Sequence, residues 1–422
     1  MAGLSEEITM LEGQIIKFYR ERQNMMQKDL GIGICSSTHI SKIERGLTEV
    51  SKETIDLLSE RLCIDMKAEI KTYIGIDSLL KKWHESIILK LKTKAKSIKK
   101  QLEAIALLHM PDIYRSYTLV LTRYYLLIGH DHQTKSLIAE MEKWSDLSPY
   151  ENSMLLHIKG INRLINKEFY KAISYFQGID LTYYNNQEYY YHLAVAYHSL
   201  NSRVMAYYYA EKSLRFFTEM RSITRMIEAE MLMLLQVEQD EFYEPKDTEY
   251  QRLIEMTENF SLDHQRAMLT HNLAYQKVRQ GKYEKASEYY KQSIDTSDPH
   301  TEIYLAALEG YIKALTKQGL KSTEELLQLA EKGIALSEEI NETIFKHSFH
   351  LHKYNLQNDH EQYYHYLEKE AFPYFKKMAY VSLFEHYSIK LFDYHMEKGN
   401  VEEANQYAAY LVEKYRRNDK FA

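Results

Sequence analysis

The sequence predicts an all-α protein, because three of its features favour helices over strands. Only 5 prolines and 14 glycines occur among 422 residues, which suits long helices joined by short turns. Apolar residues step by three and four along much of the chain, which places them on one face of a helix. A unit of two helices also recurs through most of the chain, which predicts a superhelix of stacked helix pairs.

The composition is typical of a soluble globular protein. Charged residues make up 27% of the chain and hydrophobic residues 45%. No stretch approaches the ~20 apolar residues that a membrane helix needs, and Met1–Met10 lacks the basic start and apolar run of a signal peptide. Cys35 and Cys63 are the only cysteines, too few for a disulfide framework or a zinc site. We therefore expect a cytoplasmic protein without a metal or cofactor.

Residues 26–46 have the pattern of a helix-turn-helix motif. The spacing predicts a first helix over 26–34, a turn over 34–36 and a second helix over 37–45. Gly46 then ends the second helix in the left-handed conformation that glycine adopts without strain. We expect the N-terminal domain to be organised around this motif.

The two faces of the motif differ in character. Leu30, Ile40 and Ile43 are its apolar positions, and the last two share one helical face, so that they can be buried together. The opposite face of the second helix is polar and can enter a DNA groove. We assign DNA binding to Ser37, Thr38, His39 and Lys42. Gln27 opens the first helix, where N–H groups can hold a phosphate. The alternative is a small helical hairpin with a polar surface.

Apolar stripes on both sides extend the motif to a domain of four helices over residues 1–65. Before it, Leu11, Ile15 and Phe18 step by four and three. After it, Ser51 can cap a helix with the apolar stripe Ile55, Leu58 and Leu62. The domain resembles the DNA-binding domain of Cro and related repressors. Its net charge is slightly negative, so one copy should bind DNA weakly, which favours a dimer on two half-sites.

Residues 66–105 predict one long amphipathic connecting helix. Eight lysines crowd its second half, and apolar residues lie between them. The lysines are Lys81, Lys82, Lys90, Lys92, Lys94, Lys96, Lys99 and Lys100; the apolar residues are Ile87, Ile88, Leu91, Ile98 and Leu102. These lysines can lie along DNA phosphates, which would make DNA binding salt-dependent. A solvated helix face explains them equally well.

From residue 106 to the end, a unit of two helices recurs with a period of roughly 34–40 residues. Three copies each follow a turn and carry an alanine where helices can cross: 169–179 with Ala172, 204–214 with Ala206, and 282–294 with Ala286. This is the tetratricopeptide-repeat pattern, whose stacked units enclose a concave inner surface. We expect about seven to nine units over 106–422, with a degenerate copy near 245–260. The ends, including Glu361–Tyr380, should deviate as caps.

No sequence motif indicates an enzyme. The patterns GxxxxGK[ST], GxSxG and HExxH are all absent. His347, His350 and His352 form a dense histidine group, but no neighbouring carboxylate or cysteine completes a metal site there. We therefore predict neither catalysis nor metal binding.

The inner surface of the predicted superhelix is the best candidate for ligand binding. The first helix of each repeat lines this surface, so its polar residues can meet a ligand. We assign peptide binding to Arg123, Asn162, His192, Tyr197 and Asn272. An asparagine amide can both donate to and accept from one peptide unit, and an arginine can pair with a carboxylate through two hydrogen bonds. For each residue, the alternative is an exposed or inter-repeat hydrogen bond.

A Cro-type domain joined to tetratricopeptide repeats resembles the peptide-pheromone receptors of Gram-positive bacteria, the RNPP family named for Rap, NprR, PlcR and PrgX. The resemblance spans nearly the whole chain, and its length and repeat number are nearest to the neutral protease regulators. The motif has the one-residue-shorter turn of this family. Its residues are Gln27, Leu30, Ile34, Cys35, Ile40, Ser41, Lys42, Ile43, Glu44 and Gly46.

The resemblance implies a quorum-sensing transcription regulator. Its ligand would be a short secreted peptide that is re-imported and bound inside the superhelix. Asn272 matches the inner-helix asparagine that holds the peptide backbone, and Arg123 matches the position that meets a peptide acid or carbonyl. The protein would be a homodimer, or a tetramer with peptide, and the peptide would shift its assembly and DNA binding.

The resemblance also implies a second role. Proteins similar to the neutral protease regulators bind, without peptide, a response regulator of the sporulation phosphorelay. Rap proteins dephosphorylate that partner with a glutamine in an N-terminal helical bundle, whereas this chain has a DNA-binding domain there, so sequestration is the expected form. The alternative to a transcription regulator is therefore a Rap-like interaction protein in which DNA binding is secondary.

Overall fold

The computed structural model describes the backbone of residues 2–237, 247–319, 321–377 and 381–418, and the side chains of 9–237, 247–319, 321–377 and 383–412. Over these residues the chain consists of helices and turns without a strand, which confirms the predicted all-α class. It divides into two compact units. The N-terminal unit comprises residues 1–162 and 178–185, and the C-terminal unit comprises residues 163–177 and 186–422.

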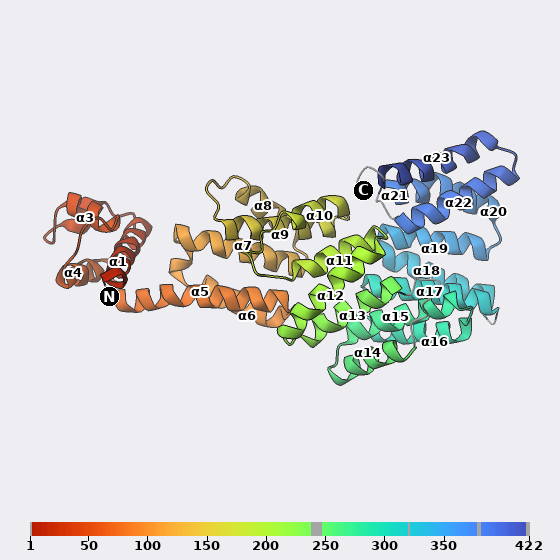
Figure 1. Cartoon of the computed structure of the whole chain (residues 1–422), viewed down its shortest axis with the longest axis horizontal. Coiled ribbons are helices and arrows are strands. Elements are labelled where there is room, and N and C mark those ends of the chain that lie inside the picture. The colour runs from red at the N-terminus through yellow and green to blue at the C-terminus, as the bar shows by residue number, and fades with distance from the viewer. Residues whose placement is uncertain (1, 238–246, 320, 378–380, 419–422) are drawn as a thin grey trace. The chain divides into compact units, whose positions relative to one another are not determined.

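Four helices open the N-terminal unit (Figure 1): α1 (Ala2–Arg22), α2 (Gln27–Gly31), α3 (Ser37–Glu44) and α4 (Lys52–Leu62). The predicted 26–34 helix is too long, because Ile32 leaves the helical conformation and Gly33 has a φ of 70°. Gly46, with a φ of 65°, ends the second helix as predicted. Leu30 and Ile40 are fully buried, so the apolar spacing of the motif does form the core of this region.

The predicted single connecting helix over 66–105 is instead two helices, α5 (Met66–Ile88) and α6 (Lys92–Glu103). The chain breaks at Lys90, whose φ of 56° is left-handed and costs ~1–2 kcal/mol for such a residue. Ile87 on α5 and Ile98 on α6 are buried in one core, so the two helices pack against each other instead of continuing. The domain limits at residues 65 and 105 stay a prediction. The unit continues through η1 (Ala106–His109), α7 (Pro111–Ile128), α8 (Asp131–Met141) and the part of α9 (Pro149–Ile165) up to residue 162.

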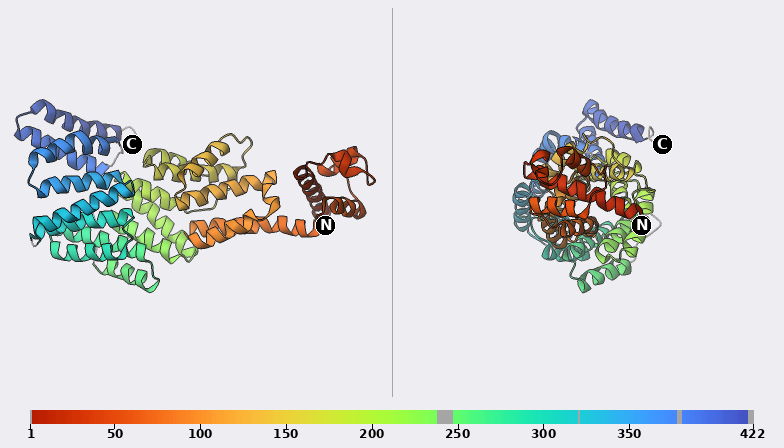
Figure 2. Two further views of the ribbon diagram at one scale, coloured as in Figure 1. Left: turned by 180° about the vertical axis from the view of Figure 1, so that it is seen from behind. Right: turned by 90° about the vertical axis from the view of Figure 1, so that its left-hand side faces the viewer.

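In the C-terminal unit, most helices that are consecutive in the chain pack against each other (Figure 2). They are α10 (Phe169–Gln177), α11 (Tyr189–Ser199), α12 (Arg203–Glu219), α13 (Ile223–Val237), α14 (Asp247–Asn259), α15 (Asp263–Arg279), α16 (Tyr283–Thr296), α17 (Glu302–Gln318), α18 (Thr323–Glu339), α19 (Thr343–Leu356), α20 (His360–Tyr366), η2 (Leu367–Ala371), α21 (Phe372–Lys377), α22 (Val381–Glu397) and α23 (Val401–Asn418). Alternate helices α11, α13, α15, α17 and α19 contact one another in sequence, and we call them the inner helices.

The turns of the repeat pattern are present where the sequence predicts them. Lys167, Asn201 and Gly281 each have a positive φ just before a helix. The alanines expected at helix crossings are completely buried: Ala172, Ala206 and Ala286. Helix α14 lies at the place of the degenerate copy near 245–260. The repeat pattern in the sequence therefore predicts where these helices and the short turns between them lie.

The C-terminal end departs from the repeat pattern, as predicted. The π-helix η2 lies between α20 and α21, where two successive regular helices would be expected. Of the predicted cap 361–380, residues 378–380 lie outside the described residues. None of the described helices is both long enough and apolar enough to cross a membrane.

Candidate functional site

A buried ion pair holds the first three helices together. Arg20 on α1 donates to both carboxylate oxygens of Glu44 on α3, over 2.5 and 3.0 Å. Gln27, the first residue of α2, donates to the same carboxylate over 2.7 Å. Glu44 is 5% exposed, so these donors replace the water that the carboxylate has lost. Sequence reasoning missed the pair because no local pattern links Arg20 to Glu44.

This hydrogen bond bears on the predicted role of Gln27. Its side-chain amide carries two N–H groups, and one of them is used by Glu44. The second remains for a phosphate. A phosphate contact by Gln27 therefore stays a prediction, now with its side chain held in place by Glu44.

The other residues assigned to DNA binding lie on α3. Ser37, Thr38 and Lys42 are exposed and His39 is half-buried. The backbone N–H of His39 donates to the Ser36 hydroxyl over 3.2 Å, which caps the helix just before this polar stretch. The helix therefore presents its polar residues to solvent, as a DNA-recognition helix must. Their contacts with DNA stay a prediction.

Two of the residues assigned to peptide binding lie in the N-terminal unit. Arg123 on α7 is 3% exposed, and Asn162 on α9 is half-buried. Burial, together with the nearby charge of Arg123, lowers the pKa of His84 on α5 to about 3. Sequence reasoning missed His84. Arg123 is thus placed inside its unit beside a neutral histidine, and its contact with a peptide stays a prediction.

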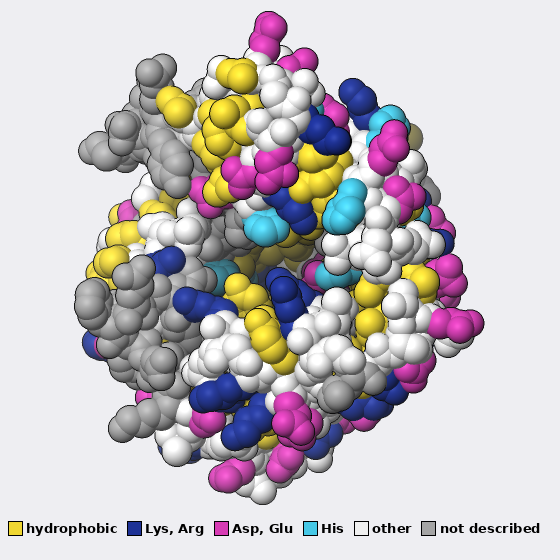
Figure 3. Space-filling view, turned by 90° about the vertical axis from the view of Figure 1, so that its right-hand side faces the viewer, with side chains coloured by type: hydrophobic (Ala, Val, Ile, Leu, Met, Phe, Trp, Pro, Cys, Tyr) yellow, Lys and Arg dark blue, Asp and Glu magenta, His cyan; other side chains and the backbone are white. Residues whose placement is uncertain are grey.

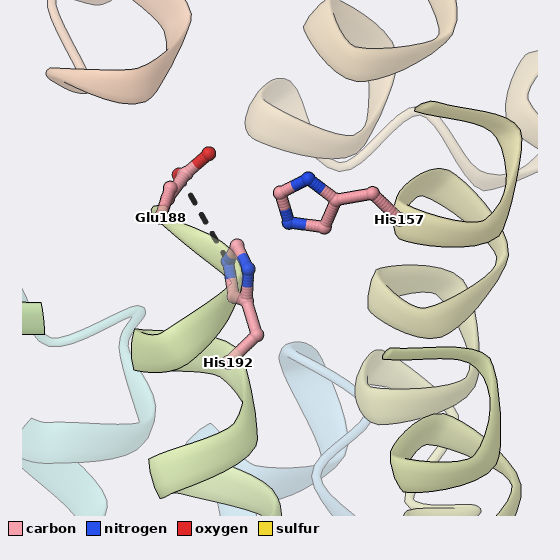
Figure 4. A group of neighbouring side chains, drawn as sticks. All are labelled: His157, Glu188 and His192. Carbon is pink, nitrogen blue, oxygen red and sulfur yellow. Dashed lines mark ion pairs between the residues drawn. The ribbon is translucent and has the colours of Figure 1, made fainter. Parts of the chain in front are cut away.

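His192 and Tyr197 lie on α11 and pack against neighbouring side chains. The His192 ring stacks on Phe176 with ring centres 5.9 Å apart. Its Nε2 lies 3.9 Å from the Glu188 carboxylate, the ion pair drawn in Figure 4. The Tyr197 ring stacks on Tyr209 at 5.6 Å. These contacts are of the inter-repeat kind that we gave as the alternative, and peptide binding by the two residues stays a prediction.

An ion network that the sequence analysis missed joins three inner helices. Arg225 on α13 has no exposed surface, pairs with Glu228, and lies 3.6 Å from Glu188 at the start of α11. Gln265 on α15 donates to Glu228 over 3.0 Å. The Arg225 guanidinium also lies 4.3 Å from the centre of the Tyr191 ring. Burial acts to lower the pKa of Arg225, but the two carboxylates raise it above its ordinary value. The signal in the sequence was a charged pair inside the largely apolar α13.

Asn272 lies next to a second polar group on the inner helices. Its Oδ1 lies 3.2 Å from Nδ1 of His271 on α15. On the next two inner helices, Glu309 of α17 and His352 of α19 are joined by a 2.6 Å contact between Oε1 and Nε2. Burial acts to raise the pKa of Glu309, but the hydrogen bond from His352 and the nearby cationic groups lower it below its ordinary value. Asn272 therefore lies beside a group of titratable side chains that extends over α15, α17 and α19.

The expectation about the histidine group needs a correction. We expected no carboxylate near it, but Glu309 contacts His352, because α17 and α19 pack together. His347 and His350 lie against the Tyr366 ring instead, with ring centres 5.7 and 5.1 Å apart, and border a pocket of about 610 Å³. Among the described side chains, no group of metal-ligating atoms includes these three histidines.

No family model matches the chain, and no curated protein does either. Solved structures do match. The apo form of the quorum sensor NprR from B. thuringiensis is 18% identical, covers 81% of this chain and 99% of its own, and has a TM-score of 0.63. NprR in complex with its cognate peptide NprX is 20% identical, with coverages of 81% and 99% and a TM-score of 0.66. A Rap protein complexed with Competence and Sporulation Factor is 16% identical, with coverages of 82% and 99% and a TM-score of 0.68.

These structures are matched over nearly their whole length and over most of this chain. At such low identities the similarity concerns the path of the backbone and not the chemistry of individual sites. This chain therefore has the helical-repeat fold of the NprR and Rap proteins.

Proposed function

We propose that this chain is a quorum-sensing transcription regulator of the peptide-pheromone receptor family, in which a short imported peptide controls DNA binding. One observation carries the proposal. The chain joins the helix-turn-helix arrangement of α1–α4 to the fold of NprR, a protein whose structure has been solved with its cognate peptide. The DNA-binding residues are Gln27, Ser37, Thr38, His39 and Lys42; the peptide-binding residues are Arg123, Asn162, His192, Tyr197 and Asn272.

The mechanism is a population shift between assemblies of the chain. The peptide binds one arrangement of the homo-oligomer more tightly than another, and it biases DNA binding only by that difference in affinity. A tenfold difference corresponds to about 1.4 kcal/mol. In one arrangement, the two recognition helices of a dimer can bind two half-sites at the same time; in the other, they cannot.

Fluorescence anisotropy with the DNA upstream of the chain's own gene tests this proposal. The titration is repeated with synthetic peptides encoded by small open reading frames directly downstream, at one salt concentration, because affinity for DNA falls steeply with salt. We expect one peptide to change the DNA affinity at least tenfold. DNA binding that ignores every peptide would contradict peptide control, and absence of DNA binding under all conditions would contradict the regulator itself.

A Rap-like interaction protein is the second candidate. The similarity to a Rap protein in complex with Competence and Sporulation Factor favours it. In this case the helical repeats sequester a response regulator of the sporulation phosphorelay, and the peptide releases it. A pull-down with the purified response regulator, with and without peptide, distinguishes the two: a stable complex that peptide dissolves supports sequestration, and no complex in either condition contradicts it.

A further inference from the structure

Helices of the C-terminal unit bring a group of histidine and charged side chains close together. This inner cluster consists of His271 on α15, Glu309 and Lys313 on α17, His352 on α19, and His386 and Lys390 on α22. Figure 3 views the molecule from the side that lies to the right in Figure 1 and shows a hollow with histidine and basic side chains around it. The cluster draws on residues more than a hundred positions apart, so it is a product of the fold.

The one carboxylate of the inner cluster is already engaged. Glu309 contacts His352 over 2.6 Å. Lys313 lies one helical turn after Glu309 and influences it electrostatically, yet the two are not an ion pair. Counted without its histidines, the inner cluster holds two lysines against one carboxylate and carries a net positive charge.

Neither lysine of the inner cluster has an ion-pair partner within 4 Å among the described residues. His386 and Lys390 are four residues apart on α22, which places them on one face, and His386 lies within electrostatic range of both Lys390 and Lys313. Lys390 is half-buried, and its ammonium group donates to the Tyr363 hydroxyl over 2.8 Å. Burial lowers the pKa of Lys390, and no carboxylate offsets this effect. An anion bound beside Lys390 would offset the effect of burial.

We infer that Lys313 and Lys390 bind a carboxylate of the signalling peptide, so that the C-terminal unit selects peptides with an acidic group. This inference rests on the proposed function, since it names the chemistry of the same inner surface. A carboxylate between two lysines gains two charge-assisted hydrogen bonds. Lys313 is exposed, whereas Lys390 is half-buried, so the bond to Lys390 is the one that is less screened by salt. The peptide's own C-terminus and an Asp or Glu side chain both supply this group.

Affinity selection from random peptides tests the inference without knowledge of the natural ligand. The full-length chain is incubated with two libraries of short random-sequence peptides, one with free C-terminal carboxylates and one with C-terminal amides. Retained peptides are identified by mass spectrometry. Enrichment of Asp and Glu in both libraries supports a side-chain carboxylate, whereas retention from the free-acid library alone supports the terminal one.

Variants of the inner cluster make the test specific. In K313Q/K390Q, we expect the acidic enrichment to fall by at least roughly tenfold, because the loss of each of the two charge-assisted hydrogen bonds alone has about that effect. E309Q removes the cluster's own carboxylate and should raise the enrichment. K285Q, which removes an exposed lysine on α16, is the matched control and should leave it unchanged. Circular dichroism of each variant confirms that it is folded.

Two outcomes would overturn the inference, and they are distinct. Retention of peptides without any preference for acidic groups, or with a preference that K313Q/K390Q keeps, refutes the carboxylate site and leaves the proposed function standing. Failure of the wild-type chain to retain any peptide from either library counts against both the site and the peptide-controlled regulator.

Discussion

Arg20 and Glu44 face each other across α1 and α3 with two hydrogen bonds between their side chains, which are 10% and 2% exposed. Removal of one partner leaves the other charge buried and unpaired, whereas replacement of both by apolar side chains leaves no buried charge behind. The pair also holds Gln27. Its loss should therefore disturb the whole helix-turn-helix region.

Replacement of Arg20 alone tests how far this region depends on the pair. Arg20→Met should destabilise α1–α4 by about 3–5 kcal/mol, because Glu44 keeps its charge in a buried site. The double variant R20M/E44L should recover most of that loss. Hydrogen exchange of the full chain measures both, with α15 and α16 as internal reference. Equal loss of protection in the single and double variants would show that these side chains stabilise the region through packing and not through their charges.

The assignment of α3 as the DNA-recognition helix can be tested by removing two of its polar side chains. His39→Ala together with Lys42→Ala should weaken binding to the upstream DNA by about 1–3 kcal/mol for each of the two side chains that hydrogen-bonds to a base. Lys52→Ala, at an exposed position on α4, is the matched control and should have a much smaller effect. Anisotropy at one salt concentration provides the measurement. Unchanged affinity in the double variant would remove α3 from the DNA interface.

Gly310 marks a close approach between two helices of the C-terminal unit. A Cβ atom there would lie 2.3 Å from Cζ of Tyr290, so Gly310→Ala should destabilise this unit by about 1–3 kcal/mol through overpacking. Gly75 on α5 has nothing within 4 Å of its Cβ position, and Gly75→Ala should stabilise its helix by about 0.5–1 kcal/mol. Urea unfolding of the full chain compares them. Stability changes of the same sign would contradict the close approach.

Local spacing in the sequence predicts those parts of the fold that depend on one helix and its turn. The burial of Leu30 and Ile40 follows from their apolar positions in the motif, and Gly46 ends α3 because glycine takes a positive φ freely. The break at Lys90 was not predictable in this way. No glycine or proline marks it, and the burial of Ile87 and Ile98 in a shared core decides it.

The candidate sites show the same division between local and distant information. Asn272 could be named as a candidate from the sequence because a polar residue on the first helix of a predicted repeat is visible there, and its role in peptide binding stays a prediction. The contact of Glu309 with His352 was not found, because it joins residues 43 positions apart on two stacked helices. Arg225 and Glu188 likewise come together only when α11 and α13 pack. Repeat stacking, which sets such pairs, has to be seen in three dimensions.

His84 makes the stability of the N-terminal unit depend on pH. Burial and the charge of Arg123 lower its pKa from 6.5 to about 3 in the folded chain. Between these pH values the unfolded chain binds a proton at His84 that the folded chain does not bind. The free energy of unfolding is therefore unaffected by His84 above pH 6.5 and decreases as the pH falls below this value. The loss at pH 5 amounts to about 2 kcal/mol.

A variant without this imidazole should lose that part of the pH dependence. For His84→Leu, the change in stability of α5–α7 between pH 7 and pH 5 should be about 2 kcal/mol smaller than in the wild type. Hydrogen exchange of these helices in the full chain measures it, and His109→Leu, at an exposed position, is the control. An identical pH dependence in wild type and His84→Leu would mean that His84 takes up a proton in the folded chain as readily as in the unfolded chain, and that burial and the charge of Arg123 do not hold it neutral.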